Sequence, residues 1–512
     1  MLVPLSNIDA NVASASIVLS HVVGIDETWT KGDKDEFVDR LRDAAQRVVS
    51  KWRLLQGVAK KLEDGSWAVH VPDEREPSKP DHFGFIYEAV DKPYHIASGF
   101  SCRLPPLSSA SSGFFPFPDT SVFRSADAPA ILTEYERPQA SFLHIKVTAF
   151  TDAIAIGISL AHGIFDGHGM GLVVQALDAE LHHRPWPFDV PPLFSLKEGN
   201  PLVNTLDALI QDPDIAAGQV GLLSQGRGWI SSMTTKLGAV AALAASFSPW
   251  RKNEERFGFL SRTAVEKLAA EAKAEVQGLT EREEYISTSD VLTAVLLKSA
   301  HWYESSSTPI KLAAVYNARS LLSSYEPSSS SAPQPFPAYP HNSIFPYELV
   351  NPEPVTLARL NAMSVGELAL LLRRSLDSHR TLPALKSTWS YMPRLGYLPW
   401  LLEWLLVFLE LPSFLQPFQA LLTPVLPPIR HALSNQIGLK LASLSFPGRS
   451  DKDTDDLPLL AFHLSGASQL ALTNCFALQD VKAGVVFSAS LSPERWKGVE
   501  EAIEALKVGQ QE

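Results

Sequence analysis

Apolar positions in two neighbouring segments follow the spacing of β-strands. Residues 142–150 alternate between apolar and polar positions, and Thr151-Asp152 separates them from residues 153–160. The second segment, AIAIGISL, is apolar on both faces apart from Ser159. Because a strand that is covered on both sides is apolar throughout, we expect residues 153–160 to lie in the middle of a sheet.

Further strands and helices follow from the same kind of pattern. We expect strands or hairpins at residues 14–24, 61–71 (around an Asp-Gly turn), 311–319 and 483–491. Helical periodicity predicts helices at residues 34–54, 170–181, 261–274 and 289–303. Ser289 or Asp290 is the expected N-cap of the last of these helices. Ser492 is the expected N-cap of a C-terminal helix that begins with Pro493.

Strands and helices alternate in both halves of the chain, which favours an α/β protein of two domains. We expect a first domain at residues 1–187, a crossover linker at 188–255 and a second domain at 256–512. The linker is Pro-rich at first, then Ala-rich and weakly patterned. A Ser- and Pro-rich stretch at 326–340 predicts an exposed, mobile loop.

The composition excludes several classes of protein. Of 512 residues, 45% are hydrophobic and 20% are charged, the balance of a globular chain. The 56 acidic and 44 basic side chains give a formal net charge of −12, without the basic blocks of a nucleic-acid-binding protein. The two cysteines, Cys102 and Cys475, form neither a disulfide framework nor a zinc-ligand spacing. Together with an N-terminus unlike a signal peptide, they favour a cytoplasmic location.

One apolar run could be mistaken for a membrane span. Residues 398–411 read LPWLLEWLLVFLEL, which is too short to cross a bilayer and contains Glu403 and Glu410. Apolar character resumes at 414–429, where four prolines interrupt it. We expect a buried helix followed by an irregular segment, and no stable membrane span. Peripheral membrane contact, by a helix lying on a membrane surface, is the alternative.

The residues that carry chemistry come directly after the predicted central strand. His162, Asp166 and Gly167 form a His-x-x-x-Asp-Gly motif in a Gly-rich turn that leads into the 170–181 helix. A histidine that acts as a general base needs a ring that is held still and a pKa near the working pH. A tight turn between strand and helix provides that rigid placement.

The glycines around this motif and His168 are also expected to have particular roles. The glycines at 163, 167, 169 and 171 are expected to permit backbone conformations that other residues resist, and to leave room beside the imidazole. His168 is expected to be a turn histidine near the helix start, and the alternative is that it lines the same cavity as the motif.

This motif and several segments, in the same order along the chain, resemble the BAHD-type acyl-CoA-dependent acyltransferases. The similar segments are the opening Leu5-Ser6-Asn7-Ile8-Asp9, residues 52–72, the helices within 255–272 and 287–303, and the Asn-x-Arg-Ser strand at 315–320. The resemblance covers most of the chain and leaves residues 203–250 and 384–435 unmatched. Fungal-type members are more similar than plant-type members.

The resemblance implies a two-domain chloramphenicol-acetyltransferase-like fold, in which each domain is a mixed sheet with flanking helices. The active site would lie in a tunnel between the domains. His162 would be the general base that deprotonates an acceptor hydroxyl. Asp166 would point away from the substrate and pair with Arg319, so that both support the turn.

The resemblance also implies the reactants. Acyl-CoA, most simply acetyl-CoA, would be the co-substrate, and a small hydrophobic alcohol of secondary metabolism the acceptor. No metal and no bound cofactor are implied, and the protein is expected to be a monomer. Four cations lie in a region suited to CoA phosphates, and nothing in the sequence distinguishes among them: Arg251, Lys252, Arg256 and Arg262.

One departure from the family is clear. The Asp-Phe-Gly-Trp-Gly motif is absent, and the matching region at 472–480 keeps Thr473 but has Cys475 where the family has Trp. Thr473 is therefore the candidate hydrogen-bond donor to the oxyanion.

Two other functions stay open at this stage. A condensation-type relative would take its acyl group from a carrier-protein thioester, although Ala161 stands where those proteins usually have a second His. A non-catalytic ligand-binding protein with the same fold is the other.

Overall fold

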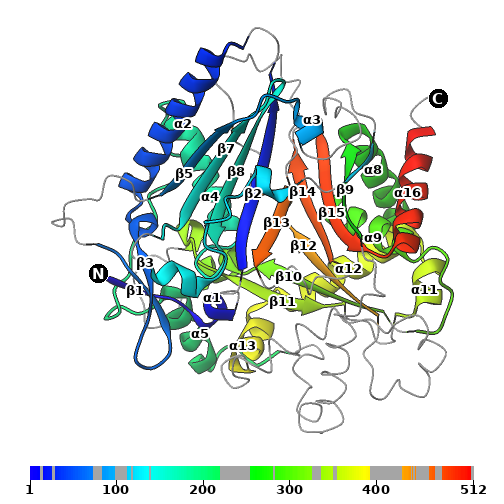
Figure 1. Cartoon of the computed structure of the whole chain (residues 1–512). Coiled ribbons are helices and arrows are strands. Elements are labelled where there is room, and N and C mark those ends of the chain that lie inside the picture. Colours follow the sequence, from blue (N-terminus) through cyan, green and yellow to red (C-terminus); the bar gives the residue numbers. More distant parts are fainter. Residues whose placement is uncertain are drawn as a thin grey trace, which may run out of the picture.

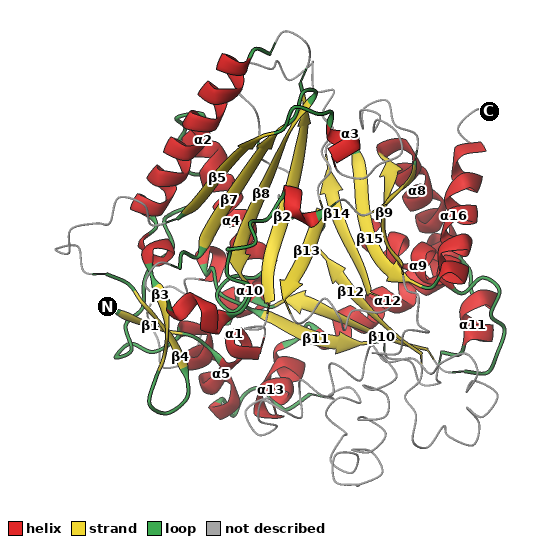
Figure 2. Ribbon diagram, in the orientation of Figure 1, coloured by secondary structure: helices red, strands yellow, loops and turns green. Residues whose placement is uncertain are grey.

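A computed structural model describes most of the chain. The residues outside the description are 12–14, 26–28, 73–82, 98–111, 117–118, 138–139, 219–253, 281–282, 309, 326–335, 350–354, 392–428, 440, 442–443, 445–460, 467–474, 482 and 509–512. The described residues form two large mixed sheets with helices packed against them, and a small three-stranded sheet near the N-terminus (Figures 1 and 2).

The first large sheet has the strand order β13-β2-β8-β7-β5. Its strands are β2 (Ala15–Gly24), β5 (Gly84–Ala89), β7 (Leu143–Ala149), β8 (Ala153–Ala161) and β13 (Ala461–Gly466). Every residue of β8 is buried, and β8 is the middle strand, as its apolar sequence predicted. Helices α2 (Lys31–Lys51) and α4 (Gly167–Leu181) pack against each other and share a hydrophobic core with this sheet.

The second large sheet has the order β11-β10-β12-β14-β15-β9-β6. Its strands are β6 (Gly113–Pro116), β9 (Glu254–Ser261), β10 (Ile310–Asn317), β11 (Ile344–Glu348), β12 (Ile429–Asn435), β14 (Cys475–Val481) and β15 (Gly484–Leu491). The helices that share its core include α8 (Arg262–Leu279), α9 (Thr288–Ala300), α12 (Val365–His379) and α16 (Pro493–Val508).

The remaining elements are short. The small sheet has the order β1-β4-β3 and contains β1 (Leu2–Pro4), β3 (Val58–Lys61) and β4 (Trp67–His70). The other helices are α1 (Asn7–Asn11), α3 (Tyr94–Ala97), α5 (Pro201–Gln211), α10 (Arg319–Ser323), α11 (Leu357–Ala362) and α13 (Leu382–Tyr391). Strands β3 and β4 are the hairpin expected around the Asp-Gly turn, where Gly65 has a φ of 84°.

Each large sheet contains one strand from the other half of the chain. β13 pairs with β2 in the first sheet, and β6 pairs with β9 in the second. The two sheets are therefore joined through shared strands rather than through the crossover alone. The domain boundaries expected at residues 187 and 255 stay a prediction.

Two local expectations were wrong. The helix expected at 289–303 is α9, and its N-cap is Ser287, because the Ser287 hydroxyl accepts from the backbone N–H of Asp290 while the Asp290 carboxylate accepts from Ser287. The stretch at 326–340 is not exposed throughout. Phe336 and Tyr339 have no exposed surface, since both pack into the core of the second sheet.

The linker expected at 188–255 also contains structure that was not expected. Helix α5 lies within it and buries Leu202, Leu206 and Leu209. Residues 392–428, which include the apolar run at 398–411, lie outside the described residues. Among the helices that the structure describes, none has the length and hydropathy to cross a membrane.

Candidate active site

His162 follows the last residue of β8 and opens the turn that leads into α4. Asp166 is the N-cap of α4, and its Oδ1 accepts a hydrogen bond from the backbone N–H of Gly169 at 3.0 Å. The turn therefore starts on a buried central strand and ends on a capped helix. Both ends are rigid elements, which limits how far the His162 ring can move.

The tautomer of His162 follows from its contact with the main chain. Its Nδ1 lies 3.2 Å from the carbonyl oxygen of Phe165. A carbonyl oxygen only accepts, so Nδ1 carries the proton of the neutral ring, and Nε2 keeps the lone pair. Burial lowers the pKa of His162 below its ordinary value, against the opposing effects of main-chain hydrogen bonds to His162 and Phe165 and of the charges of Asp166 and Asp9. The ring is therefore neutral at pH 7 and can accept a proton at Nε2.

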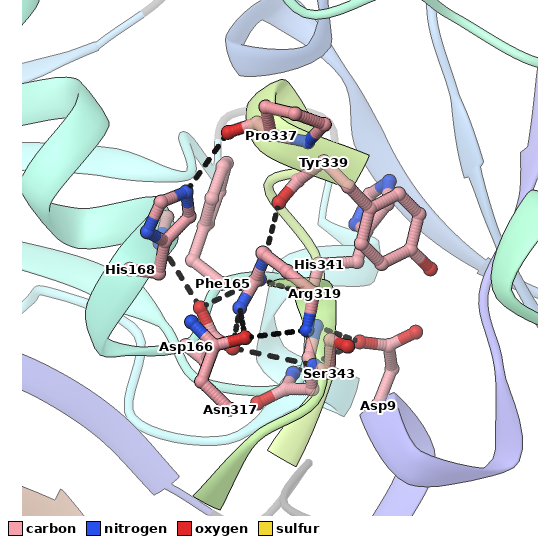
Figure 3. Close-up of polar contacts among 12 residues, drawn as sticks. Asp9, Phe165, Asp166, His168, Asn317, Arg319, Pro337, Tyr339, His341 and Ser343 are labelled. Carbon is pink, nitrogen blue, oxygen red and sulfur yellow. Dashed lines mark hydrogen bonds and ion pairs between the residues drawn. The ribbon is translucent and has the colours of Figure 1, made fainter. Parts of the chain in front are cut away.

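Asp166 and Arg319 form a buried, two-pronged ion pair (Figure 3). Arg319 Nη1 lies 2.9 Å from Asp166 Oδ2, and Nη2 lies 3.0 Å from Oδ1. Burial alone would raise the pKa of Asp166, but the charge and hydrogen bonds of Arg319 outweigh burial and lower it. Asp166 is thus an ionised carboxylate committed to Arg319, which leaves it unavailable as a proton carrier.

The other donors of Arg319 are also used. Nε donates to Tyr339 O at 2.9 Å, Nη1 donates to Asn317 Oδ1 at 3.1 Å, and Nη2 donates to His341 O. With the two bonds to Asp166, all five N–H groups of the guanidinium have an acceptor. A lysine could not replace this geometry, because its ammonium has no planar fork.

The segment from Tyr339 to Ser343 lies against the 162–166 turn, and sequence reasoning did not single it out. The backbone N–H of Ser343 donates to Asp166 Oδ2 at 3.2 Å, and the carbonyls of Tyr339 and His341 accept from Arg319. Most of these contacts use main-chain atoms, so no residue type marks them in the sequence.

The glycines of the turn and helix act through close packing rather than through unusual backbone angles. None of the glycines at 163, 167, 169 and 171 has a positive φ. A Cβ on Gly169 would lie 2.2 Å from Pro340 O, and one on Gly171 would lie 2.3 Å from Leu439 O. The expectation of unusual conformations was therefore wrong, and these two glycines instead let neighbouring backbones approach α4.

Arg319 also lines part of a cavity of about 560 Å³. Its walls come from β10, α9, α10, α12 and the start of α4, and they include His168, Arg319, Arg373 and Arg380. Hydroxyl groups from Ser287, Thr293 and Ser320 add to its polar lining. His162 is not among the lining residues, whereas His168 is, and His168 Nε2 lies 3.2 Å from Pro337 O (Figure 3).

Two arginines at this cavity, Arg373 within α12 and Arg380 at the C-cap of α12, differ in their partners. Arg373 is held by Asp290, with Nη2 and Nε at 2.7 and 2.9 Å from Oδ2. Arg380 is exposed and donates to Ser320 Oγ at 2.7 Å. No ion pair of Arg380 is seen in the described part of the chain. Arg380 therefore has positive charge available for an anionic ligand, and Arg373 has little.

The cations expected to suit CoA phosphates are otherwise engaged or undescribed. Arg256 pairs with Glu254 and Glu500. Arg262 donates to Val481 O at 2.7 Å. Arg251 and Lys252 lie outside the described residues.

Two further site expectations concern the region after β13. Thr473, the expected oxyanion donor, lies outside the described residues. Burial raises the pKa of the Cys475 thiol to about 12, so that this group is not a thiolate nucleophile at neutral pH. No cluster of His, Cys, Asp and Glu suited to a metal ion occurs among the residues that the structure describes.

No protein-family model matches the chain. In sequence, it is 28% identical over 184 residues to acetyltransferase pyiB of Pyricularia grisea, a match that covers 35% of this chain and 34% of that protein. It is 24% identical over 377 residues to O-acetyltransferase PaAT-2 of Phomopsis amygdali, which covers 67% and 68%. The first of these matches thus spans about a third of its relative's length.

In structure, the chain is similar to TRI101 of F. sporotrichioides complexed with coenzyme A and T-2, with a TM-score of 0.59, 14% identity and coverage of 98% and 97% of the two chains. It is also similar to vinorine synthase, with a TM-score of 0.52, 12% identity and coverage of 98% and 93%. At sequence identities this low, the structural similarity supports a common fold and nothing further. The predicted two-domain acyltransferase fold class is confirmed.

Proposed function

We propose that this chain, a BAHD-like relative of fungal acyltransferases that has their two-domain fold, is an acyl-CoA-dependent O-acyltransferase. The observation that carries the proposal is the state of His162. Its ring is neutral, its Nδ1 is committed to Phe165 O, and its Nε2 is left as the proton acceptor. This is the arrangement that a general base needs.

The reaction follows from that arrangement. His162 Nε2 takes the proton of an acceptor hydroxyl while the oxygen attacks the thioester carbonyl and a C–O bond forms. The tetrahedral oxyanion collapses, the C–S bond breaks, and the departing CoA thiolate takes the proton from the imidazolium. Asp166 and Arg319 take no part in proton transfer, because they are committed to each other and to the turn. Thr473 is proposed as the oxyanion donor.

The cavity beside Arg319 supports an acyl-CoA co-substrate. Its hydroxyl groups and the available charge of Arg380 suit a polar ligand that carries phosphate groups. The names of the sequence relatives favour an acetyl group, and the T-2 bound to TRI101 favours a bulky alcohol of secondary metabolism as the acceptor. The proposal needs no resident cofactor and no metal.

The organisation of the protein is proposed in the same way. We retain a monomer in the cytoplasm, with domains at 1–187 and 256–512 and a crossover at 188–255. The cysteine content supports the location, and peripheral membrane contact by residues 398–411 stays the alternative to a freely soluble chain.

The test is thiol release from acetyl-CoA in the presence of a panel of hydrophobic alcohols. We expect release that depends on the alcohol and is lost in the His162→Ala variant. Release only with an acylated carrier protein would instead identify a condensation-type enzyme. Ligand binding without release, unchanged in the same variant, would identify a non-catalytic relative.

A further inference from the structure

Asp9, on the short helix α1, is a fully buried carboxyl group whose pKa burial raises, while the charge of His341 and hydrogen bonds from Ser6 and Asn342 act to lower it. Its Oδ2 accepts from the backbone N–H and the hydroxyl of Ser6 at 2.8 and 2.7 Å. Its Oδ1 accepts from the backbone N–H and the side-chain Nδ2 of Asn342 at 2.8 and 2.9 Å. No Lys or Arg ion pair of Asp9 occurs among the described residues. All four of these groups donate, so the hydrogen bonds favour the carboxylate form against the effect of burial.

Asn342 continues this chain of contacts to His162. Its Nδ2 has two hydrogens, and the second reaches the carbonyl oxygen of His162 at 2.8 Å. The amide orientation is fixed by chemistry, because a flipped amide would place its oxygen against two acceptors, the Asp9 carboxylate and the His162 carbonyl. Asp9, Asn342 and His162 are therefore linked in series through one amide group.

The residues on either side of Asn342 bind the same turn. His341 Nδ1 lies 3.0 Å from Ile164 O, and the backbone N–H of Ser343 donates to Asp166 Oδ2 at 3.2 Å. Residues 341–343 thus bind every second residue of the turn, namely Ile164, His162 and Asp166. Figure 3 shows Asp9, His341 and Ser343 gathered on the side of Arg319 away from His168. Only the Asn342 contact acts on His162 itself.

We propose that Asp9 and Asn342 are positioning residues that hold the backbone of His162 and thereby fix the direction of its Nε2. This inference rests on the proposed function. Removing the link frees the His162 carbonyl at the point where strand β8 ends, so the ring loses its alignment with the acceptor hydroxyl. A misplacement of about 1 Å in such a geometry costs about 100-fold in rate.

The Asp9 carboxylate also acts on the ring through its charge, since it raises the pKa of His162 against the effect of burial. The other charged group that acts on the ring in the same direction is Asp166, which is itself paired with Arg319. Removing the charge of Asp9 therefore lowers the pKa of His162 further. A residue that only stabilised the fold would leave that pKa unchanged.

The test compares Asn342→Ala and Asp9→Asn with the control Asn361→Ala. Asn361 is matched to Asn342, because its Nδ2 also bridges two oxygen acceptors, here the carbonyl oxygens of His301 and Glu304 rather than those of the His162 turn. Rates of thiol release are measured per folded molecule, with folding checked by near-UV circular dichroism.

For Asn342→Ala we expect kcat to fall about 100-fold with a KM for acyl-CoA within about twofold of the original. For Asp9→Asn we expect a lower kcat and an acidic limb of the pH–rate profile displaced to lower pH. The control should keep kcat and the pH profile. Unchanged kcat and pH profile in both test variants, or an equal loss in the control, would overturn the proposal.

Two further experiments distinguish a failure of this proposal from a misfolded variant and from a failure of the proposed function. If Asp9→Asn or Asn342→Ala does not fold, Ser6→Ala removes only one donor to Asp9 and should produce the same displacement in weaker form. If the unaltered protein shows no thiol release, the proposed function fails, but NMR titration of His162 still tests the link. A His162 pKa that is the same with and without the Asp9 charge contradicts the inference directly.

Discussion

Arg319 and Asp166, 153 positions apart in the chain, meet through two parallel hydrogen bonds in a site where both side chains are almost fully buried. Removing one partner of such a pair leaves a buried charge without compensation, which typically costs about 3–5 kcal/mol. We expect Arg319→Ala to lower the free energy of unfolding by this amount and to abolish thiol release. Chemical denaturation of both proteins measures the difference.

A matched surface pair provides the control for Arg319. Arg374 and Glu284 also form a two-pronged contact, but more than half of the Arg374 side chain is exposed. Arg374→Ala should therefore change stability by no more than about 1 kcal/mol. Equal losses in the two variants would mean that the buried pair is no more important than a solvent-screened one.

His162→Ala is expected to fold normally and to lose about 100- to 10,000-fold in kcat, the usual contribution of a general base. The ring bonds to main-chain groups of its own turn, those of Phe165 and of His162 itself, so its removal should leave the packing of β8 and α4 intact. His182→Ala, at the C-terminal end of α4, is the control and should keep full activity. Full activity in the His162 variant would remove the basis of the proposed mechanism.

The pH dependence of the rate follows from the direction of the His162 pKa shift. Burial lowers this pKa from 6.5, and only the neutral ring can accept a proton. The rate should therefore be constant at and above pH 7 and should fall only as the pH drops below about 6.5. Measurement of kcat/KM between pH 4.5 and 9 checks this. A fall that begins above pH 7 would indicate a raised pKa and contradict the burial argument.

Much of the active-site frame could be predicted from sequence, because its elements have strong local signals. The uniformly apolar segment at 153–160 is suited only to a covered strand, and it is β8. The Gly-rich turn with His162 then follows at a known place. The pairing of Asp166 with Arg319 could not be derived from spacing, since a separation of 153 residues has no local signature. It came from the family resemblance.

The contacts of residues 339–343 could not be predicted for a different reason. Tyr339 O, His341 O and Ser343 N act through the main chain, which every residue type carries. The exchange of β6 and β13 between the two sheets could not be predicted either. A strand of only four residues, such as β6, has too few positions to show a hydrophobic period. Tertiary packing, rather than local propensity, decides both features.

Arg380→Ala should weaken the binding of acyl-CoA. The side chain has no carboxylate partner in the described residues and lies at the wall of the polar cavity. The loss of one charge-assisted hydrogen bond to a phosphate corresponds to about a tenfold rise in KM for acyl-CoA, with little change in kcat. Arg374→Ala, in the helix that Arg380 caps but outside the cavity lining, is the control. An unchanged KM would place the phosphates elsewhere.

Gly169→Ala should disrupt the contact between α4 and the 339–343 segment. A Cβ at this position would lie 2.2 Å from Pro340 O, a backbone atom that cannot move aside cheaply. Either the helix or the segment must shift, and the segment carries the Asn342 contact to His162. We expect losses of both stability and kcat.

Gly278→Ala, in the exposed end of α8 with nothing within 4 Å of the added carbon, should instead stabilise the protein by up to about 1 kcal/mol. Thermal melts and rates of the two variants decide between local crowding and a general effect of alanine. A Gly169→Ala variant that gained stability as Gly278→Ala does would show that the 339–343 segment does not lie against α4 in solution.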